Sequence, residues 1–291
     1  MADWFNILNS KKNLGVLDLI RSIFPTVWLA ISSFGAAFSL ILSAWFLSVS
    51  WLLAGLCSLV TLVVLLKSGQ LKANGFFLVS RVTLIGTLVF SALIIAMDQS
   101  AAATVVVLLQ LASWLLYEFW YSPLKRPEKS RFKIGEKLPD LTFTQMDGQT
   151  YSTAESDLSQ LLLFYRGNWC GVCMAQVRQI ADEYHKFSGK KVEILLISNQ
   201  PIEEVKRLSR VYPGVKRFLV DEHGSEIKRL GLVHRWATPI HEAVIKGFPR
   251  DSVLPTVIAI DSRSRILYAD FTEEYRIRPE PEAFLRVFAA A

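Results

Sequence analysis

The stretch LLLFYRGNWCGVCMAQ, residues 161–176, places two cysteines three positions apart directly after a run of apolar residues. Such a run is typical of a strand buried in a parallel sheet, and the residues that follow Cys173 have helical spacing. Cys170 then falls at the N-terminus of a helix, where unpaired N–H groups and the helix dipole favour a thiolate. Cys173 lies one turn further on, within reach of Cys170 for a disulfide. The stretch therefore predicts a strand, a reactive dithiol and a helix.

The two thiols have different roles in this prediction. The thiolate is the nucleophile, so we expect Cys170 to have the lower pKa and to attack the substrate. Cys173, deeper in the helix, is expected to keep a higher pKa and to resolve the mixed disulfide or sulfenic acid. The alternatives are an inert buried pair and half of a zinc site. Zinc requires four ligands, and the histidines are scattered and form no second paired motif, so no metal and no cofactor are predicted.

Charged residues divide the chain of 291 residues into two parts. Residues 24–66 contain no Asp, Glu, Lys, Arg or His, whereas charges recur every few residues from position 125 onward. The hydrophobic fraction of 52% is high for a soluble protein. Three cysteines are too few for a secreted disulfide scaffold. We therefore expect a membrane domain followed by a water-soluble domain.

Four apolar segments are long enough to be membrane-spanning helices, since one crossing needs about 20 residues. They cover residues 24–44, 46–66, 76–97 and 101–121. The predicted fold class is an α-helical transmembrane bundle of four spans followed by an α/β domain. The predicted boundaries are residues 1–122 for the four-helix membrane domain, 123–133 for a basic linker on the membrane surface, and 134–291 for the α/β domain.

The basic residues predict the orientation of the chain. Lys and Arg are enriched in cytoplasmic segments, and with four spans every basic segment falls on one side. These residues are Lys11, Lys12 and Arg21 before the first span, Lys67 and Lys72 between the second and third, and Lys125, Arg126, Lys129, Arg131 and Lys133 after the fourth. Both termini and the α/β domain are therefore predicted on the cytoplasmic side of a multi-pass inner or cytoplasmic membrane protein. This arrangement accounts for the formal charge of +6, and in the absence of a nucleic-acid motif no nucleic acid is predicted as a partner.

Few polar groups lie within the predicted spans. Arg81 and Glu118 lie about one turn from the predicted cytoplasmic ends, where snorkelling or an edge position explains them without a function. Cys57, in the middle of the second span, is predicted to be a small apolar filler. No histidine lies in the spans, so the sequence offers no support for a haem or a quinone bound there.

Residues 134–291 alternate between strand and helix patterns. The Asp147-Gly148 pair predicts a hairpin turn between two strands, and residues 191–198 form a second buried apolar run after the dithiol. Pro201 followed by two glutamates is typical of a helix start. This alternation predicts a sheet covered by helices.

The sequence WCGVC after a buried strand resembles the thioredoxin active site, with valine in place of proline. Leu254-Pro255-Thr256 resembles the segment that carries a cis-proline in the thioredoxin fold. The wider pattern, from residue 134 to the C-terminus, is similar to the peroxiredoxin-like AhpC/TSA redoxin family. The motifs that carry this similarity are LPDLTFTQMDGQTYS, LLLFYRGNWCGVC, FLVDEHGSEIKRLGL and EEYRIRPEPEAFLRVF. The resemblance implies a thioredoxin-like fold, catalysis by Cys170 and Cys173, and Trp169, Gly171 and Pro255 as neighbours of the dithiol.

The chain departs from this family near the dithiol. Peroxiredoxins carry a threonine three residues before the reactive cysteine that helps to bind peroxide, and this chain has Gly167 at that position. The family also places a distant arginine beside the thiolate, for which Arg235 and Arg250 are candidates by position. Arg166 is closer in sequence and is a further candidate for lowering the pKa of Cys170.

The predicted function is that of a membrane-anchored thiol–disulfide oxidoreductase that uses Cys170 and Cys173 to reduce disulfides or peroxides. Its expected partners are a thiol reductant such as a thioredoxin or glutathione system, a protein disulfide or hydroperoxide substrate, and the lipid bilayer. Alternatively, the domain is a redox sensor or interaction module whose disulfide state is signalled through the membrane domain. Residues 231–252 have no clean period and form either a lid or partner surface over the dithiol or an ordinary packed insertion.

Overall fold

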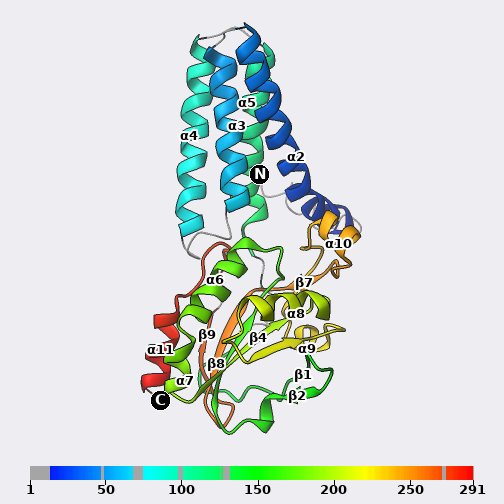
Figure 1. Cartoon of the computed structure of the whole chain (residues 1–291), viewed down its shortest axis with the longest axis vertical. Helices are drawn as coiled ribbons and strands as arrows, with labels where there is room; N and C mark the ends of the chain where they lie inside the picture. Colours follow the sequence, from blue (N-terminus) through cyan, green and yellow to red (C-terminus); the bar gives the residue numbers. More distant parts are fainter. Residues whose placement is uncertain are drawn as a thin grey trace, which may run out of the picture.

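The computed structural model describes residues 14–46, 49–67, 75–97, 101–124, 126, 132–270 and 273–290. A tall bundle of helices from the first half of the chain stands on an α/β domain from the second half (Figure 1). The dithiol helix α6 (Gly171–Asp182) lies directly beneath the bundle (Figure 1). The junction between the two parts therefore lies next to the predicted reactive site.

Four helices form the bundle, at the positions that the apolar segments predict. They are α2 (Leu14–Phe46), α3 (Val49–Lys67), α4 (Gly75–Met97) and α5 (Ala101–Leu116), the last continued by the π-helical turn η2 (Tyr117–Tyr121). Helix α2 begins well before the predicted start at residue 24 and includes Pro25. The segments Ile20–Ile41 and Thr104–Tyr121 are long and apolar enough to cross a membrane, whereas Ala54–Val64 and Phe77–Leu93 are shorter apolar segments. The described residues therefore contain two candidate spans, and four crossings remain a prediction.

Part of the orientation argument lies outside the described residues. This applies to the basic residues Lys11, Lys12, Lys72, Lys125, Lys129 and Arg131.

The bundle differs from a soluble helical protein in the number of polar side chains that it buries and of large apolar side chains that it exposes. Beside apolar residues such as Ala54, Val107 and Trp114, its interior contains the buried polar residues Ser32, Ser39, Ser58, Thr61, Ser80, Thr83, Thr87, Ser91, Gln110 and Ser113. Gln110 Nε2 donates to Ser32 Oγ and Ser58 Oγ, each at 3.4 Å. Large apolar side chains face outward instead, among them Phe34, Ile41, Leu78, Val82, Ile85, Val89, Val105 and Phe119. Small and polar residues at helix contacts are typical of packing in a membrane.

The α/β domain is built on a mixed sheet of seven strands in the order β2-β1-β5-β4-β3-β8-β9. The central strands β3, β4 and β5 are parallel to one another, and β8 pairs with β3 in the antiparallel direction. The strand bounds are β1 (Thr142–Gln145), β2 (Thr150–Ser152), β3 (Ser159–Phe164), β4 (Val192–Ser198), β5 (Arg217–Val220), β8 (Thr256–Ile260) and β9 (Ile266–Ala269). Continuous burial of β3 and β4 explains why their sequences are apolar throughout.

Helices cover this sheet, and a small excursion leaves it before β8. The helices are α6, α7 (Tyr184–Gly189), α8 (Ile202–Val211), α9 (Ser225–Arg229) and α11 (Pro281–Ala290), with a short 3-10 turn, η4 (Thr153–Glu155), after β2. The excursion consists of α10 (Ile240–Lys246) between β6 (Val233–His234) and β7 (Ser252–Val253), which pair with each other. The strand and helix order confirms the predicted thioredoxin-like α/β fold of the C-terminal domain.

The linker is more closely packed than the predicted surface stalk. Leu124 is buried, and its N–H donates to Glu273 O at 2.6 Å. Arg126 Nη1 donates to Thr256 Oγ1 at 2.9 Å, at the start of β8. The described part of the linker is therefore fixed to the α/β domain, while residues 125 and 127–131 lie outside the described residues.

Candidate active site

The two thiols lie at the start of α6, which follows β3 in the chain, as predicted. Cys170 is the N-cap residue of α6, and Cys173 belongs to its first turn. Both are free thiols; Cys170 is 4% exposed and Cys173 is fully buried. The Cys170 N–H donates to Gly167 O, and the Met174 N–H donates to Cys170 O, each at 3.0 Å. These backbone bonds hold the Cys170 side chain at the end of the helix.

The pKa values of the two thiols are shifted in the reverse of the predicted order. Burial by itself raises the pKa of Cys173, but the hydrogen bond from the Cys170 thiol, the Arg278 guanidinium and the Arg166 N–H outweigh it and bring the pKa to about 6. Burial, followed by the hydrogen bond to Cys173 and its charge, raises the pKa of Cys170 well above its ordinary value. The prediction of a low pKa at Cys170 is therefore wrong for this arrangement, because the deeper sulfur receives more of the donors.

Two buried arginines supply the positive charge at the dithiol. Arg166, predicted as a candidate, is almost fully buried; its Nη2 donates to Ala237 O at 2.8 Å, and its Cζ lies 4.6 Å from the Trp169 ring centre. Arg278, which the sequence reading did not select, lowers the pKa of both thiols. Its segment, EEYRIRPEPE, belongs to one of the motifs that carry the family resemblance.

The arginines predicted by sequence position lie elsewhere. Arg235 and Arg250 are exposed, and Arg250 Cζ lies 4.9 Å from the Trp236 ring centre. Both belong to the excursion before β8, which folds back on itself. Neither is among the groups that shift the pKa of Cys170 or Cys173.

Gly167 has a backbone conformation that other residues rarely adopt. Its φ is +149°, and a Cβ at this position would lie 2.8 Å from Trp169 Nε1 and 3.1 Å from Gln200 Oε1. A threonine therefore does not fit where peroxiredoxins are expected to carry one. The glycine allows the indole of Trp169 to pack across the turn before Cys170.

Pro255 differs from the expectation that it is a cis-proline. None of the peptide bonds in the described parts of the chain is cis. Pro255 precedes β8, whose Thr256 pairs with Phe164 at the end of β3, and its carbonyl accepts a hydrogen bond from Arg126 Nη2. The linker arginine thus occupies the Pro255 carbonyl, and Pro255 is not among the residues that line the cavity described next.

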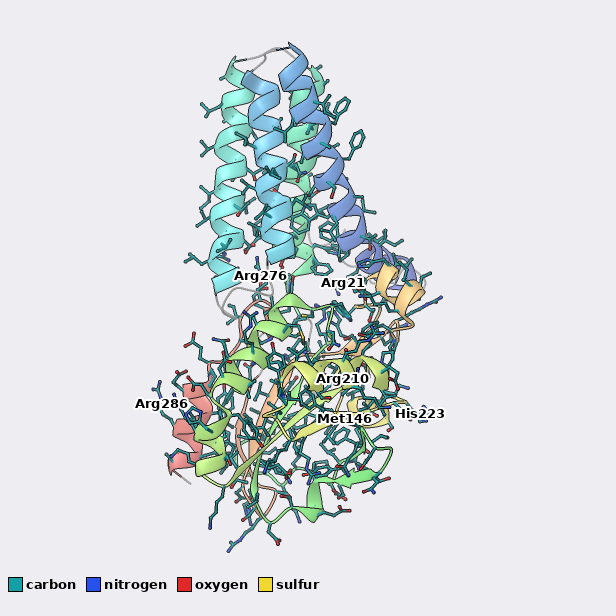
Figure 2. All side chains as sticks on the ribbon, in the orientation of Figure 1. Arg21, Met146, Arg210, His223, Arg276 and Arg286 are labelled. Carbon is teal, nitrogen blue, oxygen red and sulfur yellow. The ribbon has the colours of Figure 1, made fainter. Side chains whose placement is uncertain are left out.

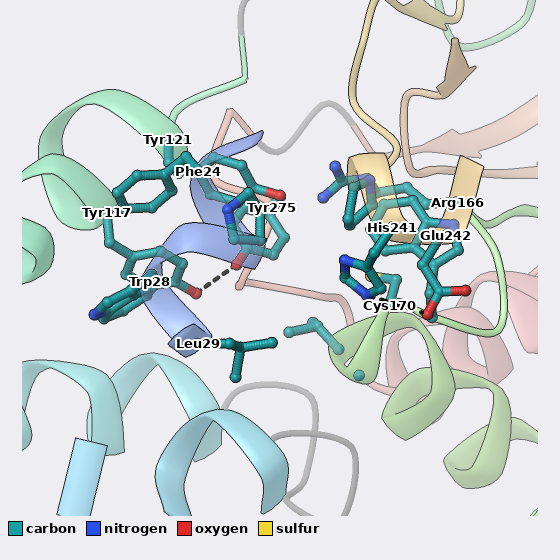
Figure 3. A pocket seen from close by; sticks show the side chains of 15 residues that line it. Phe24, Trp28, Leu29, Tyr117, Tyr121, Arg166, Cys170, His241, Glu242 and Tyr275 are labelled. Atoms are coloured by element: carbon teal, nitrogen blue, oxygen red, sulfur yellow. Dashed lines mark hydrogen bonds and ion pairs between the residues drawn. The ribbon is translucent and has the colours of Figure 1, made fainter. Parts of the chain in front are cut away.

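A cavity of about 180 Å³ lies over Cys170 at the junction of the two domains (Figure 3). The bundle contributes one wall through α2 and η2, with Phe24, Pro25, Trp28, Leu29, Tyr117 and Tyr121. The α/β domain contributes the other wall, with Arg166, Trp169, Cys170, Gly171, Val172, Pro239, His241, Glu242 and Tyr275. The predicted site residues Trp169, Gly171 and Arg166 therefore all lie at this cavity. The aromatic wall from the bundle could not be assigned to the site from the sequence.

The excursion before β8 is hydrogen-bonded to α2 beside the cavity. Ser22 Oγ donates to Thr238 O, and Thr26 Oγ1 lies 2.7 Å from His241 Nδ1. Since Pro239, His241 and Glu242 line the cavity, residues 231–252 form part of its wall. This corresponds to the lid alternative more closely than to an ordinary insertion.

A buried cluster of charges and tyrosines joins the domains beside the cavity. Arg276, which Figure 2 shows at the junction, forms ion pairs with Glu118 and with Glu274, the latter at 2.8 Å. Glu118 also pairs with Arg81 at 3.1 Å. The Tyr117 and Tyr275 hydroxyls are hydrogen-bonded to each other. Glu118, which the sequence explained by its edge position, is therefore a structural partner of the C-terminal segment, and Arg81 is linked to that segment through Glu118.

Positive charge near the site also keeps a neighbouring histidine neutral. Burial, followed by the charges of Arg166, Arg21 and Arg126, lowers the pKa of His234 well below its ordinary value. Among the described residues, no three His, Cys, Asp or Glu side chains come together in a way that could hold a metal ion. The titratable and charged residues that line the cavity are Cys170, Arg166, His241, Glu242, Tyr117, Tyr121 and Tyr275.

Comparisons with known proteins match the α/β domain. Residues 134–269 match the model of the AhpC/TSA family. Two relatives are thiol-disulfide oxidoreductases ResA: one from Bacillus cereus is 23% identical over 119 residues, which is 40% of this chain and 66% of the relative. The other, from Bacillus thuringiensis, is 23% identical over 130 residues, which is 44% of this chain and 74% of the relative.

Solved structures that resemble this chain include peroxidoxin BcpB from Mycobacterium tuberculosis, with a TM-score of 0.45 and 17% sequence identity. The match covers 55% of this chain and 98% of that chain. A peroxiredoxin-like protein from Aquifex aeolicus has 13% identity, 55% and 88% coverage, and a TM-score of 0.46. The family match confirms the predicted AhpC/TSA resemblance of the C-terminal domain and, with the ResA relatives, the prediction of an oxidoreductase. The bundle lies outside the matched residues.

Proposed function

We propose that this AhpC/TSA-type domain is a membrane-anchored thiol–disulfide oxidoreductase in which Cys170 and Cys173 alternate between a dithiol and a disulfide. The observation that carries the proposal is the free dithiol at the start of α6, with two buried arginines that favour its ionised form. A buried cation beside a thiol lowers the free energy of the thiolate, which is the reactive species. The family match and the ResA relatives support the same chemistry.

The two thiols divide the reaction according to their exposure. Cys170 lines the cavity, whereas Cys173 is fully buried behind it. Because the thiols are hydrogen-bonded to each other, Cys173 can accept the Cys170 proton as Cys170 attacks a substrate disulfide. A mixed disulfide then forms at Cys170, and the first substrate thiolate leaves. Cys173 next attacks the Cys170 sulfur, closes the internal disulfide and releases the second thiol. A thiol reductant of the thioredoxin or glutathione kind restores the dithiol.

Disulfide exchange is favoured over peroxide reduction as the main activity. The hydroxyl that the peroxiredoxin resemblance leads one to expect near the thiolate is replaced by Gly167, whose conformation leaves no room for a Cβ. Without that hydrogen-bonding group, peroxide is held less firmly for attack. We therefore expect slow reaction with hydroperoxides and faster reaction with disulfides.

The polarity of the bundle supports membrane anchoring. Many large apolar side chains are on its outer surface, and many serines and threonines and Gln110 are buried between its helices. This arrangement is favourable in an apolar surrounding. We propose that all four helices cross the bilayer, with the α/β domain on the cytoplasmic side. The basic residues that flank the helices favour this orientation by the positive-inside rule.

The test is a thiol exchange assay on the full chain in lipid nanodiscs. The reduced protein is mixed with oxidised glutathione, insulin, hydrogen peroxide and an organic hydroperoxide, and formation of the Cys170–Cys173 disulfide is followed by mass spectrometry. We expect fast oxidation by a disulfide and slow oxidation by peroxides, with both lost in Cys170→Ser. Fast oxidation by peroxide instead would identify a peroxidase, and no reaction with any oxidant would refute the proposed enzyme.

A second candidate, a redox sensor, is favoured by the contacts across the junction. Arg166 Cζ lies 5.3 Å from the Tyr275 ring centre, and Tyr275 is hydrogen-bonded to Tyr117 of the bundle. A change at the dithiol can therefore reach η2 through two side chains. Partner binding that depends on the disulfide state, without turnover of any disulfide, would favour the sensor over the enzyme.

A further inference from the structure

We propose that the cavity over Cys170 binds the ring of a membrane-borne quinone, which the Cys170–Cys173 dithiol reduces to the quinol. The inference rests on the proposed function, because it names an electron acceptor for the same dithiol. It concerns the junction of the domains and not the interior of the bundle, where the absence of histidine offered no support for such a ligand.

The position of the cavity points to a substrate that arrives from the membrane side. Its bundle wall is formed by one face of α2, including Trp28 and Leu29. The neighbouring residues on the same helix, Ile20 and Val27, are exposed apolar side chains on its outer face. The thickness of one helix therefore separates the cavity from the surface that we propose to be in lipid. A molecule dissolved in the bilayer has a short path to Cys170.

The size of the cavity and the burial of Cys170 favour a small ring. An apolar cavity of about 150 Å³ binds benzene, so a volume of about 180 Å³ accommodates one six-membered ring. Cys170 is 4% exposed and lines the cavity. A flat head group that enters the cavity would lie directly against the thiol.

The walls are suited to a conjugated ring with oxygen acceptors. Aromatic side chains from both domains line the cavity: Phe24, Trp28, Tyr117, Tyr121, Trp169 and Tyr275. Rings pack favourably against one another at centroid distances of about 4.5–7 Å. Two buried donors of lining residues, Arg166 Nε and Trp169 Nε1, have no hydrogen-bond partner among the described residues. Buried donors normally have acceptors, and the carbonyl oxygens of a quinone would supply them.

A lipid hydroperoxide fits these features less well. Its reactive group is carried on a flexible aliphatic chain, which makes no specific use of flat aromatic walls. Gly167 also leaves the turn before Cys170 without the hydroxyl that would hold a peroxide. The buried Arg166 guanidinium is, by contrast, well placed to stabilise the negative charge that develops on a quinone oxygen during reduction.

The reaction balances with the groups present. The Cys170 thiolate adds to a ring carbon, and an electron pair moves to a carbonyl oxygen near Arg166. The Cys173 thiolate then attacks the Cys170 sulfur, so that the S–S bond forms and the S–C bond breaks with its electron pair left on the ring. The oxygens take up the two protons that the thiols have released. Two thiols and one quinone give one disulfide and one quinol, and the thiol reductant of the proposed function renews the dithiol.

The experiment uses the full chain, reduced, in lipid nanodiscs under anaerobic conditions. Decylubiquinone or a linoleic acid hydroperoxide is mixed with the protein, and quinol formation is followed by ultraviolet absorbance together with the appearance of the Cys170–Cys173 disulfide. We expect one quinol for each disulfide, loss of both in Cys170→Ser, and slower reaction with the hydroperoxide. A hydroperoxide reaction faster than that of the quinone would overturn the inference.

Paired substitutions on α2 test the cavity itself. Leu29→Trp places an indole in the cavity and is expected to slow quinone reduction about tenfold or more. Val27→Trp adds the same side chain on the outer face of the helix and is expected to change the rate by less than about twofold. Equal rates in the two variants would contradict the inference.

Two further measurements on the unmodified protein separate the possible failures. Decylubiquinone should slow alkylation of Cys170 at a saturable concentration, which requires no variant to fold. Oxidised glutathione should convert the dithiol to the disulfide in the same sample. If glutathione oxidises the pair and quinone neither protects nor reacts, only the quinone inference fails. If neither oxidises the pair, the proposed function fails as well.

Discussion

The bundle buries many polar side chains between its helices, whereas the centre of the α/β sheet is apolar. In the bundle, Gln110 and Thr61 are buried while Ile85 is 60% exposed. In the sheet, the apolar residues Leu161 and Ile194 have no exposed surface at all. Both regions are built from apolar or amphipathic segments of ordinary helix and strand length. The difference in side-chain burial therefore reflects the surroundings of each region, which we propose to be lipid for the bundle and water for the α/β domain. If the bundle is in lipid, both regions keep most of their large apolar side chains away from water.

The junction obeys neither pattern, since it buries charges and aromatic rings together. Arg276 has no exposed surface and is neutralised by Glu118 from the bundle and Glu274 from its own segment. A buried charge is tolerated only when it is paired. The same place holds the cavity over Cys170. The reactive chemistry of the molecule is therefore concentrated where its two solvent environments meet.

The largest expected effect separates the cysteine of the bundle from those of the α/β domain. Cys170→Ser removes the nucleophile and should lower disulfide exchange by about three orders of magnitude or more. Cys57→Ser should leave the rate within about twofold, because the Cys57 thiol only donates a long bond of 3.5 Å to Thr87 Oγ1. Exchange rates are measured with oxidised glutathione in nanodiscs. A strong effect of Cys57→Ser would mean that the bundle takes part in the chemistry.

The next effect concerns the junction. Arg276→Met leaves Glu118 and Glu274 without their shared cation and should destabilise the docked arrangement by about 3–5 kcal/mol. Thermal unfolding and limited proteolysis between the domains would measure the change. Arg286→Met on α11, which contacts β9 far from the junction, serves as the matched control. Equal stability of the two variants would show that the domains are held together by other contacts.

A lysine on each region tests the difference in solvent. Ile85→Lys on the outer face of α4 should cost about 2.5–3.5 kcal/mol if that face is in lipid. Val211→Lys on α8 should cost less than about 0.5 kcal/mol, although Val211 is 65% exposed and Ile85 is 60% exposed. Membrane insertion efficiency and expression of the folded chain are the measurements. Similar tolerance at the two sites would contradict membrane anchoring of the bundle.

Gly167→Ala tests the turn before the dithiol. The positive φ and the contact with Trp169 Nε1 should together cost about 1–3 kcal/mol. Gly189→Ala at the end of α7 is the control, because a Cβ there meets nothing within 4 Å. Denaturant unfolding of the two variants gives the difference. If Gly167→Ala is as stable as its control, the glycine is not required by the backbone.

The last expected effect concerns the pH dependence of the dithiol. The pKa of Cys173 is lowered to about 6 from 9.0, so the thiolate contributes to the stability of the reduced protein. That contribution is complete above pH 9.0, decreases as the pH falls, and is absent below about 6. Thiolate absorbance near the ultraviolet edge should titrate with a midpoint near that lower value. Arg278→Gln should move the midpoint upward by about one unit or more. An unchanged midpoint would show that Arg278 does not lower the pKa of Cys173.

Local patterns were sufficient to predict the elements. The apolar run before Cys170 predicted β3, and the spacing after Cys173 predicted α6. Both predictions succeeded because strand burial and helix periodicity depend on residues that are close together in the sequence. The apolar segments likewise predicted the four helices of the bundle. The family motifs predicted that Trp169 and Gly171 lie beside the dithiol, and both line the cavity.

Groups that come from distant parts of the chain were not predictable in this way. Arg278 follows Cys173 by about a hundred residues, and Tyr275 meets Tyr117 across 158 positions. Arg235 and Arg250 were chosen by position in the chain, and both are exposed. The order of the two thiol pKa values also depended on such groups, since Arg278 acts on both sulfurs and the backbone of Arg166 reaches the deeper one.

The sequence by itself determined a dithiol at a helix N-terminus, an apolar first half and an α/β second half, because each of these depends on residues within one or two turns or strands of one another. Only the tertiary structure decided that the pKa of Cys173 is lowered while that of Cys170 is raised, that Pro255 is trans and bound by the linker, and that the bundle supplies one wall of the cavity over Cys170. These outcomes depend on desolvation and on groups that folding brings together from distant parts of the chain. The spacing of neighbouring residues in the sequence does not reveal either effect.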